Sequence, residues 1–454
     1  MDLARETGGV APSIPDEVRG LLTELWGAGQ AAYVVGGSLR DSLLGRAAAD
    51  WDLATDARPP RLQELFPGAV YENQFGTVAV RRADAVYEIT TFRTDHDYAD
   101  FRRPHRVEFG DSIELDLARR DFTVNALAWG APPGAEPGLV DPFDGRVDLE
   151  QRLLRAVGEP GERFSEDALR MIRAVRLAAT LDFVIEPDTL AAIEHHAYLV
   201  RHLSGERIAA ELDKLLAAPR PSIGLRLMAE TGLLGHVSPE LGRQVGVAQN
   251  KIPGEDLWEH TLRSVDAVPA DRPIVRLAAL VHDIGKPATA ADGHFYGHER
   301  VGADLAAAFL TRLHYPRSVV DRVVSLVRQH MFAYQAEWSD TAVRRFIAKV
   351  KVPLLDELFE LRRADNVGSG RPPEAAGLEE LRSRVDEQLR ARVALDRSGL
   401  AIDGGDLMRE LGLQQGPRIG VILETLLERV MNDPALNDRA SLLRLARSLV
   451  EDES

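Results

Sequence analysis

Two carboxylates stand two residues apart, at Asp50 and Asp52, shortly after a pair of glycines, Gly36 and Gly37. On a β-strand, side chains two residues apart point to the same face, so these carboxylates would lie side by side. Paired carboxylates repel each other unless a cation lies between them, and Mg²⁺ held by carboxylates and substrate phosphates serves phosphoryl transfer. A lone Asp-x-Asp is also common at solvated strand ends, but the glycine pair upstream favours a catalytic role.

The glycine pair separates a predicted buried strand over 31–35 from a predicted helix over 38–44. Glycines let the backbone approach a ligand closely, and the N-terminus of a helix offers free N–H groups that suit a phosphate. Arg40 adds a positive charge one turn into this helix. The segment therefore predicts a phosphate-binding turn, with Gly37 and Arg40 as nucleotide-binding residues.

A second polar pattern places residues three apart, at Asp167, Arg170, Arg173 and Arg176, and predicts one polar stripe along a helix. A carboxylate accepts hydrogen bonds and a guanidinium donates them, so a fixed Asp–Arg pair could address the edge of a base. Cytosine and adenine both present an amino donor beside a ring-nitrogen acceptor, so such a pair could accept either base and disfavour uracil and guanine. From spacing alone, an exposed, salt-bridged helix face is the more common explanation.

These segments, in this order, resemble the polymerase-β-like nucleotidyltransferase superfamily and, more narrowly, the class II CCA-adding enzymes and bacterial poly(A) polymerases. The match begins with residues 33–55 and spans about 30–215. Its further segments are TTFR at 90–93, DYADFRRP at 97–104, DLARRDFTVNALA at 116–128, DPFDGRVDL at 141–149 and VGEPGERFSEDALRMIRAVRLA at 157–178. An ordered set of this kind is far more specific than one short motif.

The resemblance assigns a role to each residue group. It implies that Asp50 and Asp52 hold Mg²⁺ and that Asp167 and Arg170 select the base. Nucleotide binding then extends to three arginines: Arg120, which matches the family arginine that contacts the incoming nucleotide, and Arg173 and Arg176, which would support the triphosphate.

Other residues of the matching segments have weaker assignments. We expect Asp121 and Asn125 to hold the architecture, and Glu88 is a candidate third carboxylate. Residues 93–111 resemble the flexible loop with which the family switches from C to A addition. Because this loop is complete here, the resemblance favours addition of all three nucleotides.

Histidines and aspartates in the second half form a third pattern, His260, His282–Asp283 and Asp365. The adjacent His282–Asp283 pair lies on a predicted apolar helix, and a buried carboxylate needs a cation or hydrogen bonds. Imidazole and carboxylate together suit a divalent transition metal. The order resembles the HD-domain phosphohydrolases, in which positions such as His298 and His330 can hold a second metal. His294 and His314 fit no such position and are predicted to be surface residues.

Composition sets the frame for these sites. The 454 residues are 45% hydrophobic but only 6% aromatic, which favours helices with Ala, Leu and Val cores. The absence of Cys excludes disulfides and thiolate metal sites. The net charge of −16 argues against an overall basic coat, so RNA contacts should concentrate in patches such as 102–106 and Arg344–Arg345. No signal peptide or membrane span is recognisable, and we expect a cytoplasmic protein without a membrane partner.

The predicted fold class is α+β, with a polymerase-β-like head of mixed small sheet and helices followed by an all-helical neck and body that include an HD domain. The predicted parts are the head at 1–148, a helical neck that binds RNA and nucleotide at 149–250, the HD domain at 251–370 and a helical C-terminal tail at 371–454.

The resemblance implies an enzyme that adds C, C and A to the tRNA 3′ end from CTP and ATP. The alternatives are a poly(A) polymerase, a specialised CC- or A-adding enzyme, or a protein that is primarily an HD-type metal phosphohydrolase. The length of the product distinguishes a poly(A) polymerase from a CCA-adding enzyme. Tests with CTP alone and with ATP alone identify a specialised CC- or A-adding enzyme.

Overall fold

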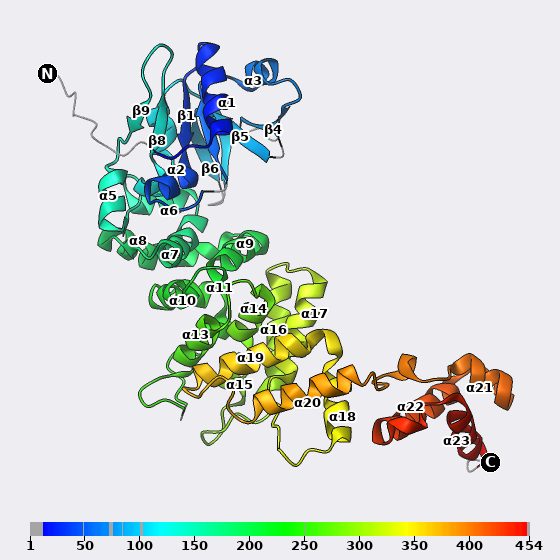
Figure 1. The fold of residues 1–454 in the computed structure, drawn as a ribbon. Helices are drawn as coiled ribbons and strands as arrows, with labels where there is room; N and C mark the ends of the chain where they lie inside the picture. The colour runs from blue at the N-terminus through cyan, green and yellow to red at the C-terminus, as the bar shows by residue number, and fades with distance from the viewer. Residues whose placement is uncertain are drawn as a thin grey trace. The chain divides into compact units, whose positions relative to one another are not determined.

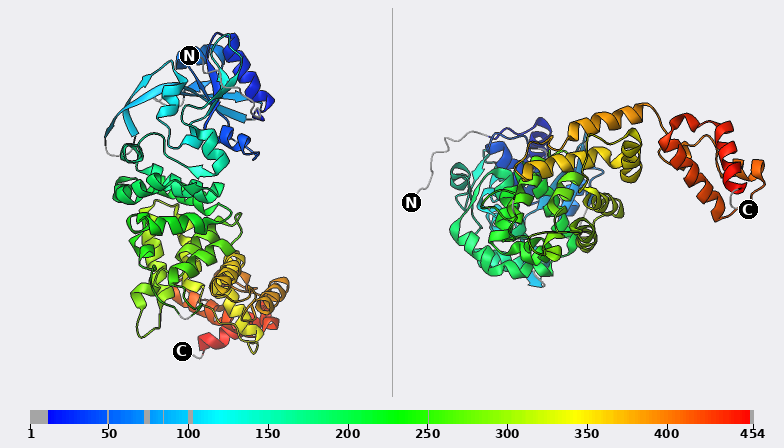
Figure 2. Two further views of the ribbon diagram at one scale, coloured as in Figure 1. Left: turned by 90° about the vertical axis from the view of Figure 1, so that its left-hand side faces the viewer. Right: turned by 90° about the horizontal axis from the view of Figure 1, so that it is seen from below.

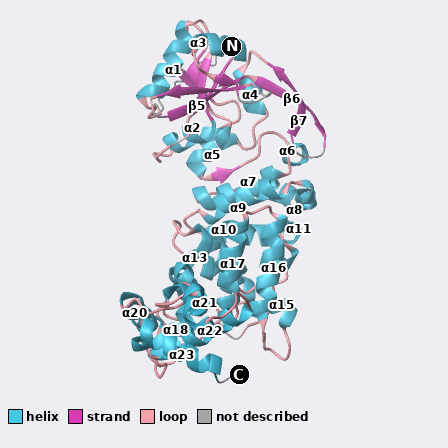
Figure 3. Cartoon of the chain, turned by 90° about the vertical axis from the view of Figure 1, so that its right-hand side faces the viewer, coloured by secondary structure: helices cyan, strands magenta, loops and turns pink. Residues whose placement is uncertain are grey.

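The computed structural model describes residues 12–48, 50–71, 76–83, 85–99, 103–249 and 251–451, without the side chains of 95–107. Two compact units, Met1–Gly242 and Arg243–Ser454, divide the chain. The described strands gather in the first unit, whereas the second unit is built of helices (Figure 1, Figure 3). The predicted fold class, a mixed-sheet head followed by a helical body, is confirmed.

A mixed sheet forms the centre of the first unit. Within the described residues its strand order is β3-β4-β5-β2-β1-β8-β9. Strand β1 (Ala32–Val35) is antiparallel to both neighbours, β2 (Asp52–Thr55) and β8 (Ala128–Ala131), while β2 runs parallel to β5 (Ala85–Thr91). The edges are β3 (Val70–Tyr71) beside β4 (Thr77–Arg82), and β9 (Gly138–Val140). All four residues of β1 are buried, as the apolar run 31–35 predicts.

Helix α1 (Asp16–Gly27) illustrates how the local sequence sets an element. Acidic residues occupy its first turn, where the helix dipole favours negative charge. Its buried residues Val18, Leu21, Leu22 and Leu25 recur at helical spacing and face the protein interior. Gly29, with φ of +76°, follows the helix end in a left-handed conformation that suits glycine.

Three further helices and a hairpin surround the sheet. These are α2 (Gly36–Leu43), α3 (Pro59–Leu65), α4 (Ile113–Ala118) and the antiparallel pair β6 (Arg93–Ala99) and β7 (Arg103–Phe109). The hairpin corresponds to the predicted flexible loop. Of the predicted basic patch at 102–106, residue 102 lies outside the described residues, and the side chains of 103–106 are likewise not described.

The remainder of the first unit is almost entirely helical. It contains one short parallel pair of strands among the described residues, β10 (Leu153–Leu154) and β11 (Val184–Ile185). Its helices are η1 (Thr123–Asn125), α5 (Gly145–Gln151), α6 (Pro160–Glu166), α7 (Leu169–Leu181), α8 (Pro187–His196), η2 (Ala197–His202), α9 (Gly205–Leu216), α10 (Pro221–Glu230), α11 (Leu233–Val237) and α12 (Pro239–Gly242). Helix α7 packs against both α9 and α10, which places α9 beside the residues predicted to contact the nucleotide.

The second unit contains two groups of helices. The first comprises α13 (Leu257–Ala267), α14 (Pro273–Val281), α15 (Lys286–Thr289), α16 (His298–Arg312), α17 (Arg317–Gln329), α18 (Asp340–Val350), η3 (Val352–Leu354), α19 (Leu355–Gly368) and α20 (Leu378–Arg390). The second comprises η4 (Arg397–Gly399), α21 (Gly404–Leu411), α22 (Pro417–Asn432), η5 (Pro434–Leu436) and α23 (Arg439–Glu451). Helices α21, α22 and α23 gather as one group (Figure 2), around a hydrophobic core that includes Leu407, Leu426 and Leu442.

The prediction that Arg344–Arg345 form a basic surface patch is wrong for Arg344. Arg344 is buried on α18, where its Nη1 donates to Oε1 of Gln388 at 3.2 Å, so its charge is not available to RNA. Arg345 beside it is exposed, as are the predicted surface residues His294 and His314. None of the described helices combines the length and apolar character that crossing a membrane requires.

Candidate active site

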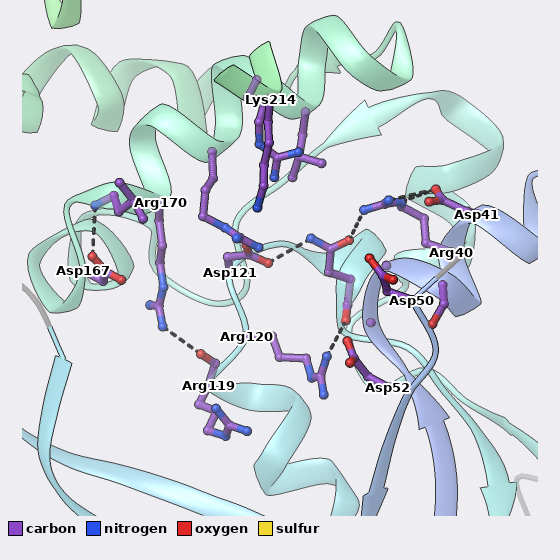
Figure 4. Close-up of a pocket in the computed structure, with 18 of the residues that line it drawn as sticks. Arg40, Asp41, Asp50, Asp52, Arg119, Arg120, Asp121, Asp167, Arg170 and Lys214 are labelled. Atoms are coloured by element: carbon purple, nitrogen blue, oxygen red, sulfur yellow. Dashed lines mark hydrogen bonds and ion pairs between the residues drawn. The ribbon is translucent and has the colours of Figure 1, made fainter. Parts of the chain in front are cut away.

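A polar cavity of about 730 Å³ opens in the first unit, between the sheet and helices α7 and α9 (Figure 4). Apart from the candidate third carboxylate, Glu88, the structure brings together here the residues that the sequence assigned to catalysis or nucleotide binding: Gly37, Arg40, Asp50, Asp52, Arg120, Asp167, Arg170, Arg173 and Arg176. Asp50 and Asp52 lie on one wall of this space, and Asp167 and Arg170 lie on another. A nucleotide in this cavity could therefore meet both sets of residues.

The glycine turn forms one edge of the cavity. Helix α2 begins at Gly36 rather than at the predicted residue 38, so both glycines belong to its first turn. Gly36 has a φ of +75°, and a Cβ there would lie 3.1 Å from Nη1 of Arg120 and 3.7 Å from Oδ2 of Asp52. A side chain at this position would fill space beside the carboxylate, so glycine keeps the helix N-terminus open to a phosphate.

The two carboxylates lie at the beginning of β2. The prediction that both belong to a strand is wrong for Asp50, because β2 begins at Asp52, yet both residues line the cavity. Partial burial raises the pKa of Asp52, Arg120 opposes the rise and Asp50 adds to it. Two neighbouring carboxylates, one with a raised pKa, form an oxygen donor set that fits a divalent cation such as Mg²⁺.

The candidate third carboxylate lies next to Asp52. Glu88 on β5 is the parallel register partner of Asp52. Both residues line a smaller cavity of about 160 Å³, which shares Arg119 and Arg120 with the larger one. The position of Glu88 is thus compatible with its predicted role.

Asp167 and Arg170 do not form a pair with one another here, and they do not share a helix. Helix α6 ends at Glu166 and α7 begins at Leu169, so Asp167 lies in the connection, against the prediction of one continuous stripe. Its Oδ1 accepts a hydrogen bond from the Leu169 N–H at 3.0 Å, and its Oδ2 accepts one from Nη2 of Arg207 at 2.7 Å.

The Arg170 guanidinium is held by three acceptors. Nη1 donates to Oε2 of Glu166 at 2.6 Å and to the carbonyl of Arg163 at 3.1 Å, and Nη2 donates to the carbonyl of Arg119 at 2.9 Å. Sequence reasoning missed Glu166, although its position four residues before Arg170 is a usual ion-pair spacing. Arg170 is also buried, so these bonds fix its donors in place.

A chain of polar contacts crosses the cavity from α2 to α7. Arg40 donates to Oδ1 of Asn125 at 2.6 Å, and Asn125 donates to Oδ1 of Asp121 at 3.0 Å. Asp121 accepts a further bond from Nε of Arg173 at 2.8 Å. Burial alone would raise the pKa of Asp121, but Arg173 and the Asn125 hydrogen bond together hold it well below its ordinary value. The expectation that Asp121 and Asn125 hold the architecture fits these contacts.

Arg176 completes the arginine set on α7 through a residue that the sequence did not indicate. Its Nε donates to Oε2 of Glu211 at 2.5 Å, and Glu211 on α9 also lies 3.8 Å from Arg173. Burial lowers the pKa of Arg176, and Glu211 opposes that shift. The buried Glu211 carboxylate thus balances two cations of the cavity wall.

The second unit holds a buried group of six residues, which we name the HD cluster: His260, His282, Asp283, His298, His330 and Asp365. Within the described residues, two sets have ligand atoms close enough for one metal ion each, and Asp283 belongs to both. Asp283 Oδ2 lies 3.2 Å from Nε2 of His260 and 3.1 Å from Nε2 of His282. Its Oδ1 lies 3.3 Å from Nε2 of His298, and His330 is 3.6 Å away. The predicted ligands therefore converge, although His282 and Asp283 follow α14 rather than lie on it.

The tautomers of three histidines favour metal ligation. The Nδ1 atoms of His282, His298 and His330 face backbone carbonyls at 2.8, 2.7 and 2.7 Å, so each carries its proton there. Their Nε2 lone pairs therefore point inward, and those of His298 and His330 face each other at 3.3 Å. Facing lone pairs require a shared proton or a cation between them, so this donor set fits a metal ion.

Two lysines that the sequence analysis did not single out also contact the HD cluster. Lys286 pairs with Asp283 at 2.5 Å, and Lys251 lies 3.4 Å from Asp365 and 3.2 Å from Nε2 of His260. Burial by itself would raise the pKa of Asp283, but the positive charge beside it, including the Lys286 ammonium, holds it well below its ordinary value. The carboxylate at the centre of the cluster is therefore ionised and available as a ligand.

Comparison with known proteins identifies the domains that contain these two sites. Three domain models match: the Poly A polymerase head domain over 32–155, the probable RNA and SrmB-binding site of polymerase A over 182–244, and the HD domain over 241–369. A CCA-adding enzyme of Streptococcus suis is 34% identical over 443 residues, which cover 97% of this chain and 98% of that protein. This chain belongs to the CCA-adding enzyme family.

Further relatives of the family agree over nearly the full length. The Geobacillus stearothermophilus CCA-adding enzyme is 33% identical over 93% of this chain and 94% of its own. The crystal structure of the Bacillus stearothermophilus CCA-adding enzyme in complex with CTP matches with a TM-score of 0.70 at 30% identity, covering 96% of this chain and 98% of that one. The Thermotoga maritima CCA-adding enzyme complexed with tRNA, at 21% identity and a TM-score of 0.60, shares the fold. Membership of this nucleotidyltransferase family implies use of a divalent metal.

Proposed function

We propose that this chain adds C, C and A to the 3′ end of tRNA from CTP and ATP and releases pyrophosphate. The observation that carries the proposal is the convergence, in one cavity, of a carboxylate pair, a helix N-terminus and an Asp–Arg set suited to C and A. Similarity to CCA-adding enzymes over nearly the full length favours this activity over poly(A) synthesis. The substrates support a cytoplasmic location.

In the proposed reaction, the 3′-hydroxyl oxygen of tRNA attacks the α-phosphorus of CTP or ATP. The bond from that phosphorus to the bridging oxygen breaks, pyrophosphate leaves, and the hydroxyl proton passes to solvent. Asp50 and Asp52 would hold Mg²⁺, which when bound lowers the pKa of the hydroxyl and neutralises charge on the phosphates. The N-terminus of α2 and Arg40 orient the triphosphate, and Arg120 lies beside Asp52 where charge develops.

Base selection is proposed for Asp167 and Arg170. A carboxylate acceptor beside a guanidinium donor matches the amino group and ring nitrogen that cytosine and adenine share. Uracil and guanine would set a carbonyl against the carboxylate and leave buried polar groups unpaired, which is costly. The fixed Arg170 supports this assignment, because discrimination needs a donor that does not rotate to suit the wrong base.

A primer-extension assay tests this function. A tRNA transcript that ends at the discriminator base is incubated with the protein, Mg²⁺, CTP and ATP, and products are resolved at single-nucleotide length. We expect three additions, with two from CTP alone, and none from Asp52→Ala although tRNA affinity is kept. A long A-tail would identify a poly(A) polymerase, and full activity of Asp52→Ala would refute the site.

The HD cluster supports a second candidate function, metal-dependent hydrolysis of a phosphoester. The supporting observation is the pair of His–Asp sets that share Asp283. In such a step water attacks the phosphorus of a 2′,3′-cyclic phosphate and one ring P–O bond breaks, which leaves a phosphomonoester. A divalent transition metal would supply an activated water there. Hydrolysis should be lost in His282→Ala but kept in Asp52→Ala; hydrolysis by both variants would exclude the HD cluster as its source.

RNA binding is proposed to rest on local basic surface rather than on net charge. The chain carries a net charge of −16, so contacts with phosphates must come from limited patches. Binding of tRNA should weaken steeply as salt rises, because each neutralised phosphate releases counterions. A flat response to salt would refute this proposal.

A further inference from the structure

Helix α9 presents a polar face to the nucleotide cavity. Arg207, Glu211 and Lys214 recur at spacings of four and three residues, and all three contribute to the cavity surroundings: Arg207 and Lys214 line it, and Glu211 pairs with Arg176. The sequence pattern places base selection on α7 and on the connection before it. The structure adds a second helix, whose side chains hold those of the first.

The Asp167 carboxylate depends on α9 more than Arg170 does. Arg170 is fixed by Glu166 and by two carbonyls of neighbouring segments. Asp167 accepts one local backbone bond, from Leu169, and its other oxygen accepts Nη2 of Arg207 at 2.7 Å, from a residue forty positions later. The side chains of Asp167 and Arg207 are only 20% and 21% exposed, so water competes weakly for this charged hydrogen bond.

We propose that Arg207 is a positioning residue for base selection: it holds the Asp167 carboxylate in the orientation in which the free lone pairs accept the exocyclic amino group of cytosine or adenine. This inference rests on the proposed function of Asp167. Without Arg207 the carboxylate keeps a single fixed oxygen and can turn about its Cβ–Cγ bond. Arg170 does not replace the lost partner, because its bonds to Glu166 and to two backbone carbonyls hold its guanidinium where it is.

The test measures kcat/KM for CTP and ATP against UTP and GTP on the same tRNA primer. We expect Arg207→Ala to lower the discrimination ratio about tenfold, as loss of one hydrogen bond to a charged group would. Arg207→Lys keeps the charge and should restore part of the ratio. The matched control is Arg220→Ala, which removes another 2.7 Å Arg–Asp pair, to Asp182, that is exposed and outside the cavity; its ratio should not change.

A double-mutant comparison distinguishes positioning from a general structural role. If Arg207 acts through Asp167, its removal in an Asp167→Ala background leaves the discrimination ratio unchanged, whereas a structural role would lower activity in both backgrounds. An unchanged ratio in Arg207→Ala, with an altered ratio in Asp167→Ala, would overturn this inference alone. An unchanged ratio in Asp167→Ala would instead overturn the proposed base-selecting site. Thermal unfolding of each variant verifies that it is folded.

Discussion

Replacement of Asn125 by Ala tests the polar chain that crosses the cavity. Asn125 is buried and joins two charged residues: it accepts from Arg40 at 2.6 Å and donates to Asp121 at 3.0 Å. The alanine variant removes both bonds but leaves both charges in place. It therefore measures how much the link between α2 and the residues before α7 contributes to the stability and activity of the first unit.

The expected loss of stability follows from the hydrogen-bond partners that Arg40 and Asp121 keep in the variant. A hydrogen bond to a charged group contributes about 1.5–3 kcal/mol. Arg40 retains Asp41 at 2.8 Å, and Asp121 retains Arg173 at 2.8 Å, while the cavity lets water reach the vacated space. Both losses should thus fall near the low end, and we expect a total of about 2–3 kcal/mol.

Hydrogen exchange localises this effect to the first unit. Amides of α2 and α7 that exchange through opening of the unit should do so about 30- to 150-fold faster, the factor that corresponds to 2–3 kcal/mol. In nucleotide addition, kcat/KM should fall by similar factors for CTP and ATP, because Arg40 and Arg173 lose a common support. Selectivity against UTP and GTP should stay the same, since the bonds of Asp167 and Arg170 do not involve Asn125.

The matched control is Asn437→Ala in the second unit. Asn437 also makes two hydrogen bonds, accepting from the Ala401 N–H at 2.8 Å and donating to the Gly399 carbonyl at 2.9 Å, but these groups are neutral and exposed. We expect a cost below about 1 kcal/mol and no kinetic effect. The reasoning fails if Asn125→Ala exchanges and reacts like the unaltered protein, or if it changes base selectivity.

Three further perturbations have defined outcomes. Because burial raises the pKa of Asp52, its ionisation disfavours folding at neutral pH, so Asp52→Asn should unfold at a higher temperature than the unaltered protein when no metal is present. The difference in unfolding temperature should shrink as the pH falls toward the ordinary carboxyl range. A difference that stays constant with pH would contradict this. Glu166→Gln should weaken the hold on Arg170 and reduce selectivity against UTP about tenfold, measured as kcat/KM ratios. His282→Ala removes a ligand from one of the two sets of the HD cluster, so it should lower the stoichiometry of divalent-metal binding in calorimetry while CCA addition continues; retained stoichiometry would disprove this ligand.

The sequence predicted the contents of both sites better than their internal contacts. Every residue assigned to the nucleotide site lies in one cavity, because motif residues that act on one ligand must converge wherever the chain folds. Yet the three-residue spacing of Asp167 and Arg170 suggested one helix, whereas the chain breaks between α6 and α7. Periodicity reports the average pitch of a segment, and it does not detect a break of two residues within it.

Residue type and order by themselves determined the family resemblance, the carboxylate pair, the helix N-terminus for phosphate and the HD ligand set, since local chemistry and spacing carry this information. Tertiary structure alone decided which charges meet. Arg207 contacts Asp167, which lies forty residues earlier in the chain. Glu211 on α9 contacts Arg176 on α7, and the buried Arg344 contacts Gln388. Such pairings depend on how helices pack, and packing is fixed by the whole set of buried contacts rather than by the spacing within any one segment.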